Sequence, residues 1–191
     1  SCLEEAGYKT GVTSTAIIKI GKEEFPNTYH MTMPGRFALQ GLLSRMVKAG
    51  CKFAIVETTS EGLKQWRHVG INYDYVIFTN LYREHLPSHN NSMEEYKKAK
   101  GRLFDYLNKN GPSKKLDGTT VPKTMIVNND SQGKDYFLSF AADKKITYGI
   151  KSAADIRATE ITTNNSGSEL KVGDTNLRLN IPGEFNVENA L

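Results

Sequence analysis

Two periodicities of apolar residues alternate along the chain, and together they predict an α/β protein. Apolar residues recur every three or four positions in 35–50 and 92–107, which predicts amphipathic helices. Short continuous apolar runs occur at 51–57, 74–80 and 122–130, and such runs are typical of parallel strands buried on both faces. Strands that alternate with helices favour a three-layer domain with a mostly parallel sheet.

Weaker patterns cover the rest of the chain. They predict extended segments at 11–29, with a turn at Gly21-Lys22, and at 145–150, and helices at 1–7, 60–70, 131–143 and 181–191. From about Ala154 the pattern changes to short alternating runs around 165–167 and 173–174, which predicts a small antiparallel sheet near the C-terminal end. Both chain ends fall in predicted helices, so we expect these residues to be part of a longer protein.

The second long helix carries a lysine on its apolar side. Ser92 and Glu95 form a capping-box pattern at its start. Lys100 lies four residues after Tyr96 and four before Phe104, on the apolar stripe. Burial would lower the pKa of this lysine because desolvation disfavours the ammonium, and a neutral amine can react with CO₂ to give a carbamate. The alternative, which the residues alone favour, is a lysine that extends its ammonium to solvent.

Composition and charge exclude some classes of protein. The hydrophobic share of 38% and charged share of 24% are ordinary for a globular protein. The net charge of +4 is scattered along the sequence, so we expect no nucleic-acid partner. No apolar run reaches the length of a membrane span, and no signal-peptide pattern opens the chain. Cys2 and Cys51 are far apart, which favours a reduced, cytoplasmic protein.

Polar residues follow three of the predicted parallel strands. Glu57 ends the first, His85 lies shortly after the second, and Asn128 and Asp130 end the third. Because ligands bind at the carboxyl ends of parallel strands, this sheet edge is the candidate site. A carboxylate with an imidazole can hold a divalent cation such as Mg²⁺. Each residue also has an ordinary explanation, since Glu57 can complement a helix dipole and His85 can be a loop histidine.

Hydroxyl groups precede two predicted helices. Thr59 and Ser60 stand at the start of the helix predicted at 60–70, whose first N–H groups can bind a phosphate. Arg67 can contact a phosphate through two hydrogen bonds. Simple N-capping explains the hydroxyls equally well. Thr32, before the helix at 35–50, has the same two explanations. The sequence contains no GxxxxGK[ST] phosphate loop.

Five stretches taken together resemble the Mur ligases, most closely the tripeptide-synthetase type. They read "ETTSEGL", "TNLYREHLP", "MEEYKKAKGRLF", "VNNDS" and "PGEFNVENA", in the family's order and at similar spacing over nearly the whole chain. The resemblance implies a P-loop-like central domain over 1–191, without the phosphate loop, the N-terminal UDP-binding domain and the C-terminal domain. It implies a ligase in which ATP phosphorylates the carboxylate of a UDP-N-acetylmuramoyl-peptide and an amino acid attacks the acyl phosphate, in peptidoglycan synthesis.

The resemblance also implies roles for single residues. Glu57, His85 and Lys100, the last as a carbamate, would hold Mg²⁺, and His85 and Lys100 would be catalytic. The ATP contacts would be Asn128, Asp130, Asn186 and Asn189. The contacts to the UDP-sugar substrate would be Thr32, Thr59, Ser60, Gln65 and Arg67.

The chain departs from the family pattern at five positions, and two alternatives stay open. Met33, Thr59, Glu61, Pro87 and Ser131 replace the residues that the pattern has there, which affects the substrate contacts more than the metal site. One alternative is a ligase like folylpolyglutamate or cyanophycin synthetase on the same fold. The other is a non-catalytic module. We expect these residues alone to be inactive.

Overall fold

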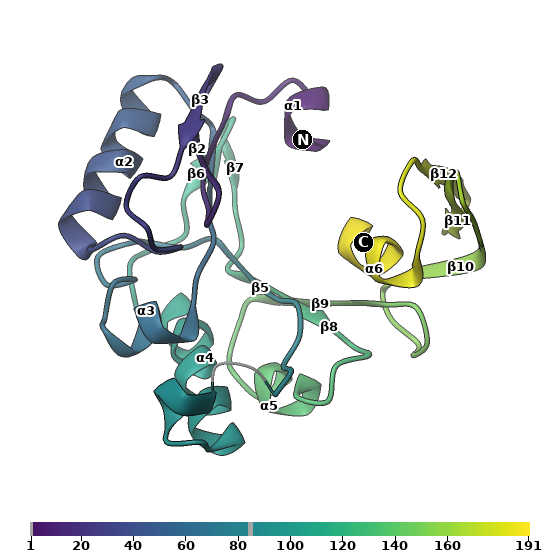
Figure 1. Ribbon diagram of the computed structural model, residues 1–191. Helices are drawn as coiled ribbons and strands as arrows, with labels where there is room; N and C mark the ends of the chain where they lie inside the picture. Colours follow the sequence, from purple (N-terminus) through teal and green to yellow (C-terminus); the bar gives the residue numbers. More distant parts are fainter. Residues whose placement is uncertain (1, 84–85) are drawn as a thin grey trace. The chain divides into compact units, whose positions relative to one another are not determined.

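The computed structural model describes residues 2–83 and 86–191, and the chain forms two compact units (Figure 1). Unit 1 comprises Ser1–Ile71 and His85–Leu103, and unit 2 comprises Asn72–Glu84 and Phe104–Leu191. Helix α4 (Met93–Leu107) supplies residues to both units.

A four-stranded sheet of order β3-β2-β1-β4 forms the centre of unit 1. Its strands are β1 (Thr10–Thr13), β2 (Ile17–Ile20), β3 (Glu23–Pro26) and β4 (Phe53–Val56). The first three strands are antiparallel neighbours, and β4 pairs in parallel with β1. The extended segment and its turn at Gly21-Lys22 are therefore confirmed, with Gly21 at a φ of +62° that a residue with a side chain rarely adopts.

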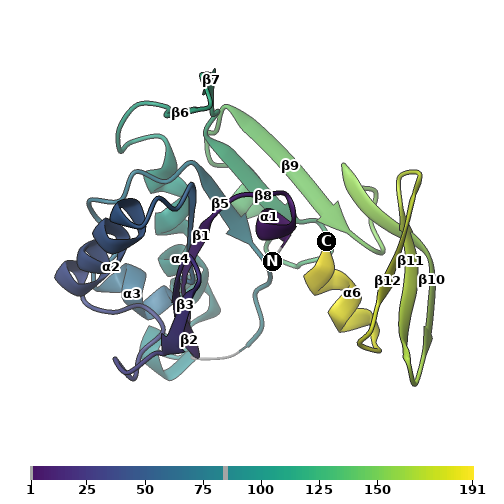
Figure 2. The ribbon, with the colours of Figure 1, turned by 90° about the horizontal axis from the view of Figure 1, so that it is seen from above.

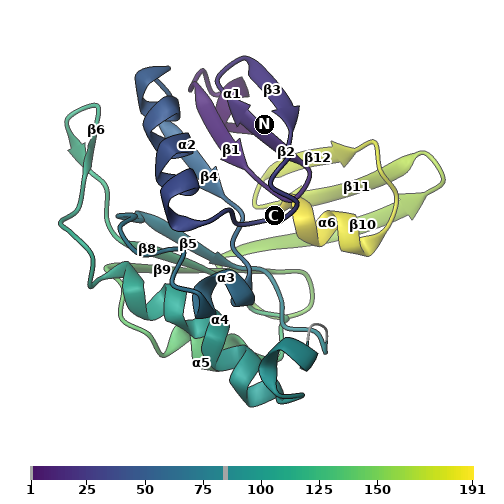
Figure 3. The ribbon, with the colours of Figure 1, turned by 60° about the vertical axis from the view of Figure 1, so that its left-hand side comes forward.

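Helix α2 (Arg36–Lys48) packs against this sheet (Figure 3). Met46 on α2 is buried with Ile18 of β2 in one apolar cluster. Gly11 of β1 permits the close approach, because a Cβ there would lie 2.5 Å from the sulfur of Met46. The helix is followed by Gly50 at a φ of +76°, which confirms the predicted stop.

Three short helices complete unit 1 with the first part of α4. They are α1 (Cys2–Glu5), α3 (Ser60–Lys64) and the 3₁₀ helix η1 (Leu86–His89). Glu4 of α1 forms an ion pair with Lys19 of β2 at 2.6 Å. The hydrogen bond from Lys19 lowers the pKa of Glu4 to about 2. The Ser92 hydroxyl accepts the Glu95 N–H at 3.3 Å, as expected for the cap of α4.

Unit 2 is built on a six-stranded sheet of order β12-β11-β10-β9-β8-β5 (Figure 2). The strands are β5 (Tyr75–Phe78), β8 (Thr124–Asn128), β9 (Lys144–Gly149), β10 (Ile156–Asn164), β11 (Gly167–Val172) and β12 (Thr175–Leu179). Strands β5, β8, β9 and β10 are parallel, and β10, β11 and β12 are antiparallel. The predicted antiparallel sheet is therefore confirmed, and it continues the parallel sheet through β10.

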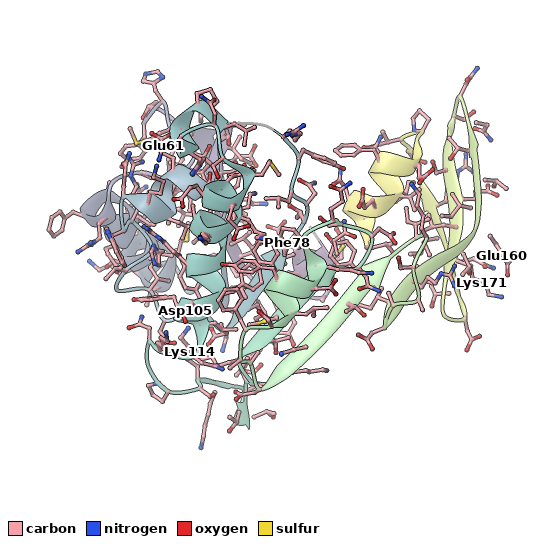
Figure 4. All side chains as sticks on the ribbon, turned by 90° about the horizontal axis from the view of Figure 1, so that it is seen from below. Glu61, Phe78, Asp105, Lys114, Glu160 and Lys171 are labelled. Carbon is pink, nitrogen blue, oxygen red and sulfur yellow. The ribbon has the colours of Figure 1, made fainter. Side chains whose placement is uncertain are left out.

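Smaller elements complete unit 2. They are the hairpin of β6 (Lys115–Leu116) and β7 (Thr119–Thr120), α5 (Lys134–Leu138) and α6 (Glu184–Ala190). Phe78, which is labelled in Figure 4, stacks on Phe137 of α5 with ring centres 3.8 Å apart. Val187 of α6 is fully buried in the apolar cluster that it forms with β10 and β11. Glu160 and Lys171 pair across β10 and β11 at 3.5 Å (Figure 4).

Two predicted strands differ from expectation in their burial. The apolar runs predicted strands buried on both faces, but β4 and β5 each end a sheet among the described residues. Ile55 of β4 is 43% exposed and Ile77 of β5 is 57% exposed. Strand β8 lies between two neighbours, and its Val127 is fully buried as predicted. No helix in the part of the chain that the structure describes is long and apolar enough to cross a membrane.

Candidate functional site

Near the carboxyl ends of β1 and β4, Thr15 joins two predicted site residues of unit 1. Glu57 follows β4, and its carboxylate accepts the Thr15 backbone N–H at 2.7 Å. The Thr15 hydroxyl lies 3.1 and 3.2 Å from the two carboxylate oxygens and 2.8 Å from the Thr32 hydroxyl. Glu57 and Thr32 are therefore joined through Thr15. Nothing in the sequence pattern indicated Thr15, which lies within the predicted extended segment 11–29.

The start of α3 holds two predicted substrate residues. Thr59 caps the helix, because its hydroxyl accepts the Gly62 N–H at 3.1 Å. Ser60 is buried, and its hydroxyl lies 2.9 Å from Nε2 of His89. Both hydroxyls therefore have partners within unit 1. The capping explanation is correct for Thr59, and His89 is a partner of Ser60 that the sequence did not indicate.

The remaining substrate residues of the prediction gather around Met33. The Arg67 guanidinium donates to the Met33 carbonyl and to the Gln65 side chain. A Cβ at Gly62 would lie 2.7 Å from the Met33 sulfur, so α3 approaches this segment closely. Thr32 directly precedes Met33 in the chain. The residues predicted to contact the UDP-sugar thus lie on neighbouring segments of unit 1.

Lys100 lies on the buried stripe of α4 as predicted. Tyr96 and Phe104 are buried, Lys100 is half-buried, and its ammonium lies 5.1 Å from the centre of the Tyr96 ring. The face of an aromatic ring attracts a cation, so this is a cation–π contact. The carbamate stays a prediction. His85, predicted as metal ligand and catalytic residue, lies outside the described residues.

The oxygen atoms around Glu57 suit a hard cation. In the described ranges, no three His, Cys, Asp or Glu side chains gather in a metal-binding group. Mg²⁺ needs only one or two carboxylates, because it retains several waters and prefers oxygen ligands. The exposed Glu57 carboxylate beside two threonine hydroxyls fits that preference. It does not resemble a structural zinc site, whose ligands are cysteine and histidine.

Asn128 and Asp130, predicted as ATP contacts, bind their own chain in unit 2. The Asn128 amide donates to the Thr79 carbonyl at 2.7 Å and to Glu188. The Asp130 carboxylate accepts the backbone N–H groups of three successive residues, Ile150, Lys151 and Ser152, at 2.6 to 3.0 Å. Burial raises the pKa of Asp130, but these N–H groups outweigh it and lower the pKa to about 2. Both side chains therefore fix loops at the carboxyl ends of the strands.

A hollow of about 260 Å³ lies beside the predicted ATP residue Asn189. It is lined by Ile77, Thr79, Ile126, Tyr148, Glu188, Asn189 and Leu191. Burial and the Glu188 charge raise the pKa of Tyr148 to about 12, so its hydroxyl stays protonated. Asn186 is directed elsewhere, because its amide donates to the Pro182 carbonyl at 2.8 Å. Of the four predicted ATP residues, Asn189 lines this hollow and Asn186 does not.

Comparison with known sequences identifies the family of this chain. The model of the Mur ligase middle domain matches residues 1–191. The chain belongs to the Mur ligase middle-domain family. Its match to the UDP-N-acetylmuramyl-tripeptide synthetase of Roseiflexus sp. is 34% identical over 201 residues, covering 99% of this chain and 38% of that protein. A UDP-N-acetylmuramoyl-L-alanyl-D-glutamate–2,6-diaminopimelate ligase of Geobacillus kaustophilus is 32% identical, covering 98% and 37%. The chain thus spans less than two fifths of these relatives.

Solved structures share the fold of this Mur ligase domain. A UDP-N-acetylmuramoyl-L-alanyl-D-glutamate–2,6-diaminopimelate ligase has a TM-score of 0.73 and 24% identity, with 98% of this chain and 37% of that one covered. MurF ligase from Thermotoga maritima in complex with ADP has a TM-score of 0.60 and 10% identity, covering 98% and 38%. A mutant of L. casei FPGS has a TM-score of 0.57 and 11% identity, covering 98% and 50%. The predicted α/β fold is confirmed.

Proposed function

We propose that this chain is the central domain of an ATP-dependent ligase that adds an amino acid to a UDP-N-acetylmuramoyl-peptide in the cytoplasm, during peptidoglycan synthesis. The family match over the whole chain supports the domain. The names of the two relatives support the branch that acts on the muramoyl peptide. One observation carries the proposal: the Glu57 carboxylate, expected to bind metal, is joined through Thr15 to Thr32, expected to bind substrate.

Each group of residues then has a task in the proposed reaction. Glu57, with His85 and a carbamylated Lys100, would hold Mg²⁺. Bound Mg²⁺ would neutralise charge on the phosphoryl group that passes from ATP to the substrate carboxylate. Thr32, Thr59, Ser60, Gln65 and Arg67 would bind and orient the UDP-sugar substrate.

The four candidate ATP residues have different roles in this proposal. Asn189 would contact the nucleotide directly, because it lines the hollow of unit 2. Asn128 and Asp130 would act indirectly, by holding loops of unit 2 in place, since their side chains form hydrogen bonds with the backbone. Asn186 would need to leave the Pro182 carbonyl to reach a nucleotide.

A ligase of the folylpolyglutamate type is the second candidate. The fold likeness to L. casei FPGS supports it. Sequence favours the muramoyl branch, because identity to the two muramoyl-peptide relatives is 32 to 34% and identity to FPGS is 11%.

The test measures ADP release by the full-length protein that contains this chain. We expect ADP to form with UDP-N-acetylmuramoyl-L-alanyl-D-glutamate and an amino acid, with diaminopimelate and lysine tried in turn. ADP release with a folate and glutamate instead would support the second candidate. No release with either pair would refute both ligase assignments. Glu57→Gln is the control, since it removes the negative charge of the proposed metal ligand and should abolish release.

A further inference from the structure

We propose that Thr15 is a positioning residue that orients both the Glu57 carboxylate and the Thr32 hydroxyl. The proposal rests on the proposed function, because that function makes Glu57 a metal ligand and Thr32 a substrate contact. Thr15 lies two residues after the end of β1, and Glu57 directly follows β4. The two strands are parallel neighbours, with Thr13 opposite Val56.

The two donors of Thr15 hold the carboxylate from one side. One carboxylate oxygen, Oε2, accepts the Thr15 N–H at 2.7 Å and lies 3.2 Å from the hydroxyl. The other, Oε1, lies 3.1 Å from the hydroxyl alone. A backbone N–H cannot rotate away as a side chain can, so it fixes Oε2. Oε1 is then the oxygen with the greater remaining capacity for a cation.

The protons available on Thr32, Thr15 and Glu57 determine which group donates in each hydrogen bond among them. A threonine hydroxyl has one proton and two lone pairs. An ionised carboxylate only accepts, so the Thr15 proton goes to Glu57. The contact between the Thr15 and Thr32 hydroxyls, at 2.8 Å, must then use the proton of Thr32. The hydrogen bonds therefore run from Thr32 to Thr15 to Glu57.

This direction restricts what Thr32 can bind. With its proton committed to Thr15, the Thr32 hydroxyl offers lone pairs only. It then recognises a hydrogen-bond donor, such as a hydroxyl or amide N–H of the substrate's sugar or peptide. An ionised phosphate has no proton to donate. The hydrogen-bond direction therefore disfavours the phosphate contact that was one of the two roles considered for Thr32 from the sequence.

A neighbouring side chain keeps the two threonines together. The Asn27 amide donates to the Ser14 carbonyl at 2.6 Å and to the Met31 carbonyl at 3.0 Å. These carbonyls belong to the residues just before Thr15 and Thr32 in the chain. Asn27 thus links the two loops at the point where the hydroxyls meet, and the contact does not depend on the threonines alone.

The test compares Thr15→Val with Thr15→Ser in the full-length protein. Valine has nearly the shape of threonine but no hydroxyl, whereas serine keeps the hydroxyl. The first measurement is Mn²⁺ affinity without substrate, from the relaxation of water protons. The second measurement determines KM for the UDP-substrate and kcat separately, to show which of the two the substitution changes. Thr58→Val is the matched control, because its hydroxyl bonds the Val56 carbonyl at 3.1 Å and does not touch Glu57.

We expect Thr15→Val to weaken Mn²⁺ binding by about tenfold, as removal of a group that orients a metal ligand commonly does. It should also raise KM for the UDP-substrate, because the Thr32 hydroxyl loses the hydrogen-bond partner that orients it. Thr15→Ser should keep both values within about twofold of the wild type, because serine retains the hydroxyl that orients the metal ligand. Thr58→Val should leave both values unchanged. Since Thr15 is exposed, valine removes no core contact, and Thr15→Ala provides a second variant.

Two outcomes separate the proposals. If Glu57→Gln weakens Mn²⁺ binding and Thr15→Val leaves both Mn²⁺ affinity and KM at wild-type values, the positioning role of Thr15 is wrong and the metal site stands. If Glu57→Gln also binds Mn²⁺ like the wild type, the proposed function has the wrong metal ligand, and the Thr15 proposal fails with it.

Discussion

At the scale of single residues, the ionised carboxylate of Asp130 stabilises the folded state. Its carboxylate accepts three backbone N–H groups from the segment after β9. These bonds need the ionised form, which is why the folded state holds the pKa at about 2, below the ordinary 3.8. A carboxyl with a lowered pKa contributes stability above its unfolded pKa, and the contribution is lost as pH falls through the folded pKa. The relevant window is therefore from about pH 4 down to pH 2.

We predict that Asp130→Asn lowers the free energy of unfolding by about 2 kcal/mol at neutral pH, an order-of-magnitude figure from the size of the pKa shift. The difference from the wild type should shrink between about pH 4 and pH 2, because the wild-type carboxyl becomes protonated there. Urea unfolding at several pH values measures it. Asp174→Asn, in the exposed turn before β12, is the control. A constant difference at every pH would mean that the charge of Asp130 is not the cause.

Single residues show which contacts could be predicted from the sequence and which could not. The apolar stripe predicted that Lys100 lies beside Tyr96, because helical periodicity is local. Thr15 was missed, because its partner Glu57 is 42 residues away in the chain and no local pattern records that contact. Asp130 follows β8 as predicted, and Asn128 is the last residue of that strand, but their partners on other segments could not be predicted from the sequence.

At the scale of elements, the hairpin of β11 and β12 depends on one glycine. Gly167 opens β11 with a φ of +151°, and a Cβ there would lie 2.1 Å from the backbone oxygen of Leu179. A backbone atom cannot move aside as a side chain can, so Gly167→Ala must separate the strands locally. Gly173, in the turn between the strands, has a φ of +56° with open space around its Cβ position.

We predict that Gly167→Ala lowers the free energy of unfolding by about 3 kcal/mol, from backbone strain and a steric clash together. Gly173→Ala should cost only about 1 kcal/mol, because it suffers the strain without the clash. Thermal unfolding of both variants measures the difference. Equal losses would show that the close approach of Leu179 does not limit the hairpin.

The elements also show which features of the pattern were informative. Helices α2 and α4 were predicted because a period near 3.6 over a long window identifies a buried face. The strand runs were predicted too, but a continuous apolar run did not distinguish the edge strands β4 and β5 from the central strand β8. Neighbours in a sheet come from distant parts of the chain, so the position of a strand in its sheet is not a local property.

At the scale of the whole molecule, the chain covers only part of the length of the relatives that it matches. The chain spans 38% and 37% of two relatives that share its family. Its sequence has no GxxxxGK[ST] loop, and such a loop cradles the phosphates of ATP through its backbone N–H groups and lysine. The candidate metal and substrate residues are nevertheless present and partly assembled in unit 1.

We therefore predict that the 191 residues alone release no ADP from ATP with UDP-N-acetylmuramoyl-L-alanyl-D-glutamate and an amino acid present. Catalysis of phosphoryl transfer depends on positioning and charge stabilisation around the phosphates, and the metal ligands alone do not provide the phosphate loop. A coupled ADP assay measures this, with the full-length protein as the positive control. Circular dichroism on the same sample must show a folded chain, so that inactivity is not mistaken for unfolding. ADP release by the folded chain would mean that another segment of these residues binds the phosphates, and the requirement for a GxxxxGK[ST] loop would be wrong.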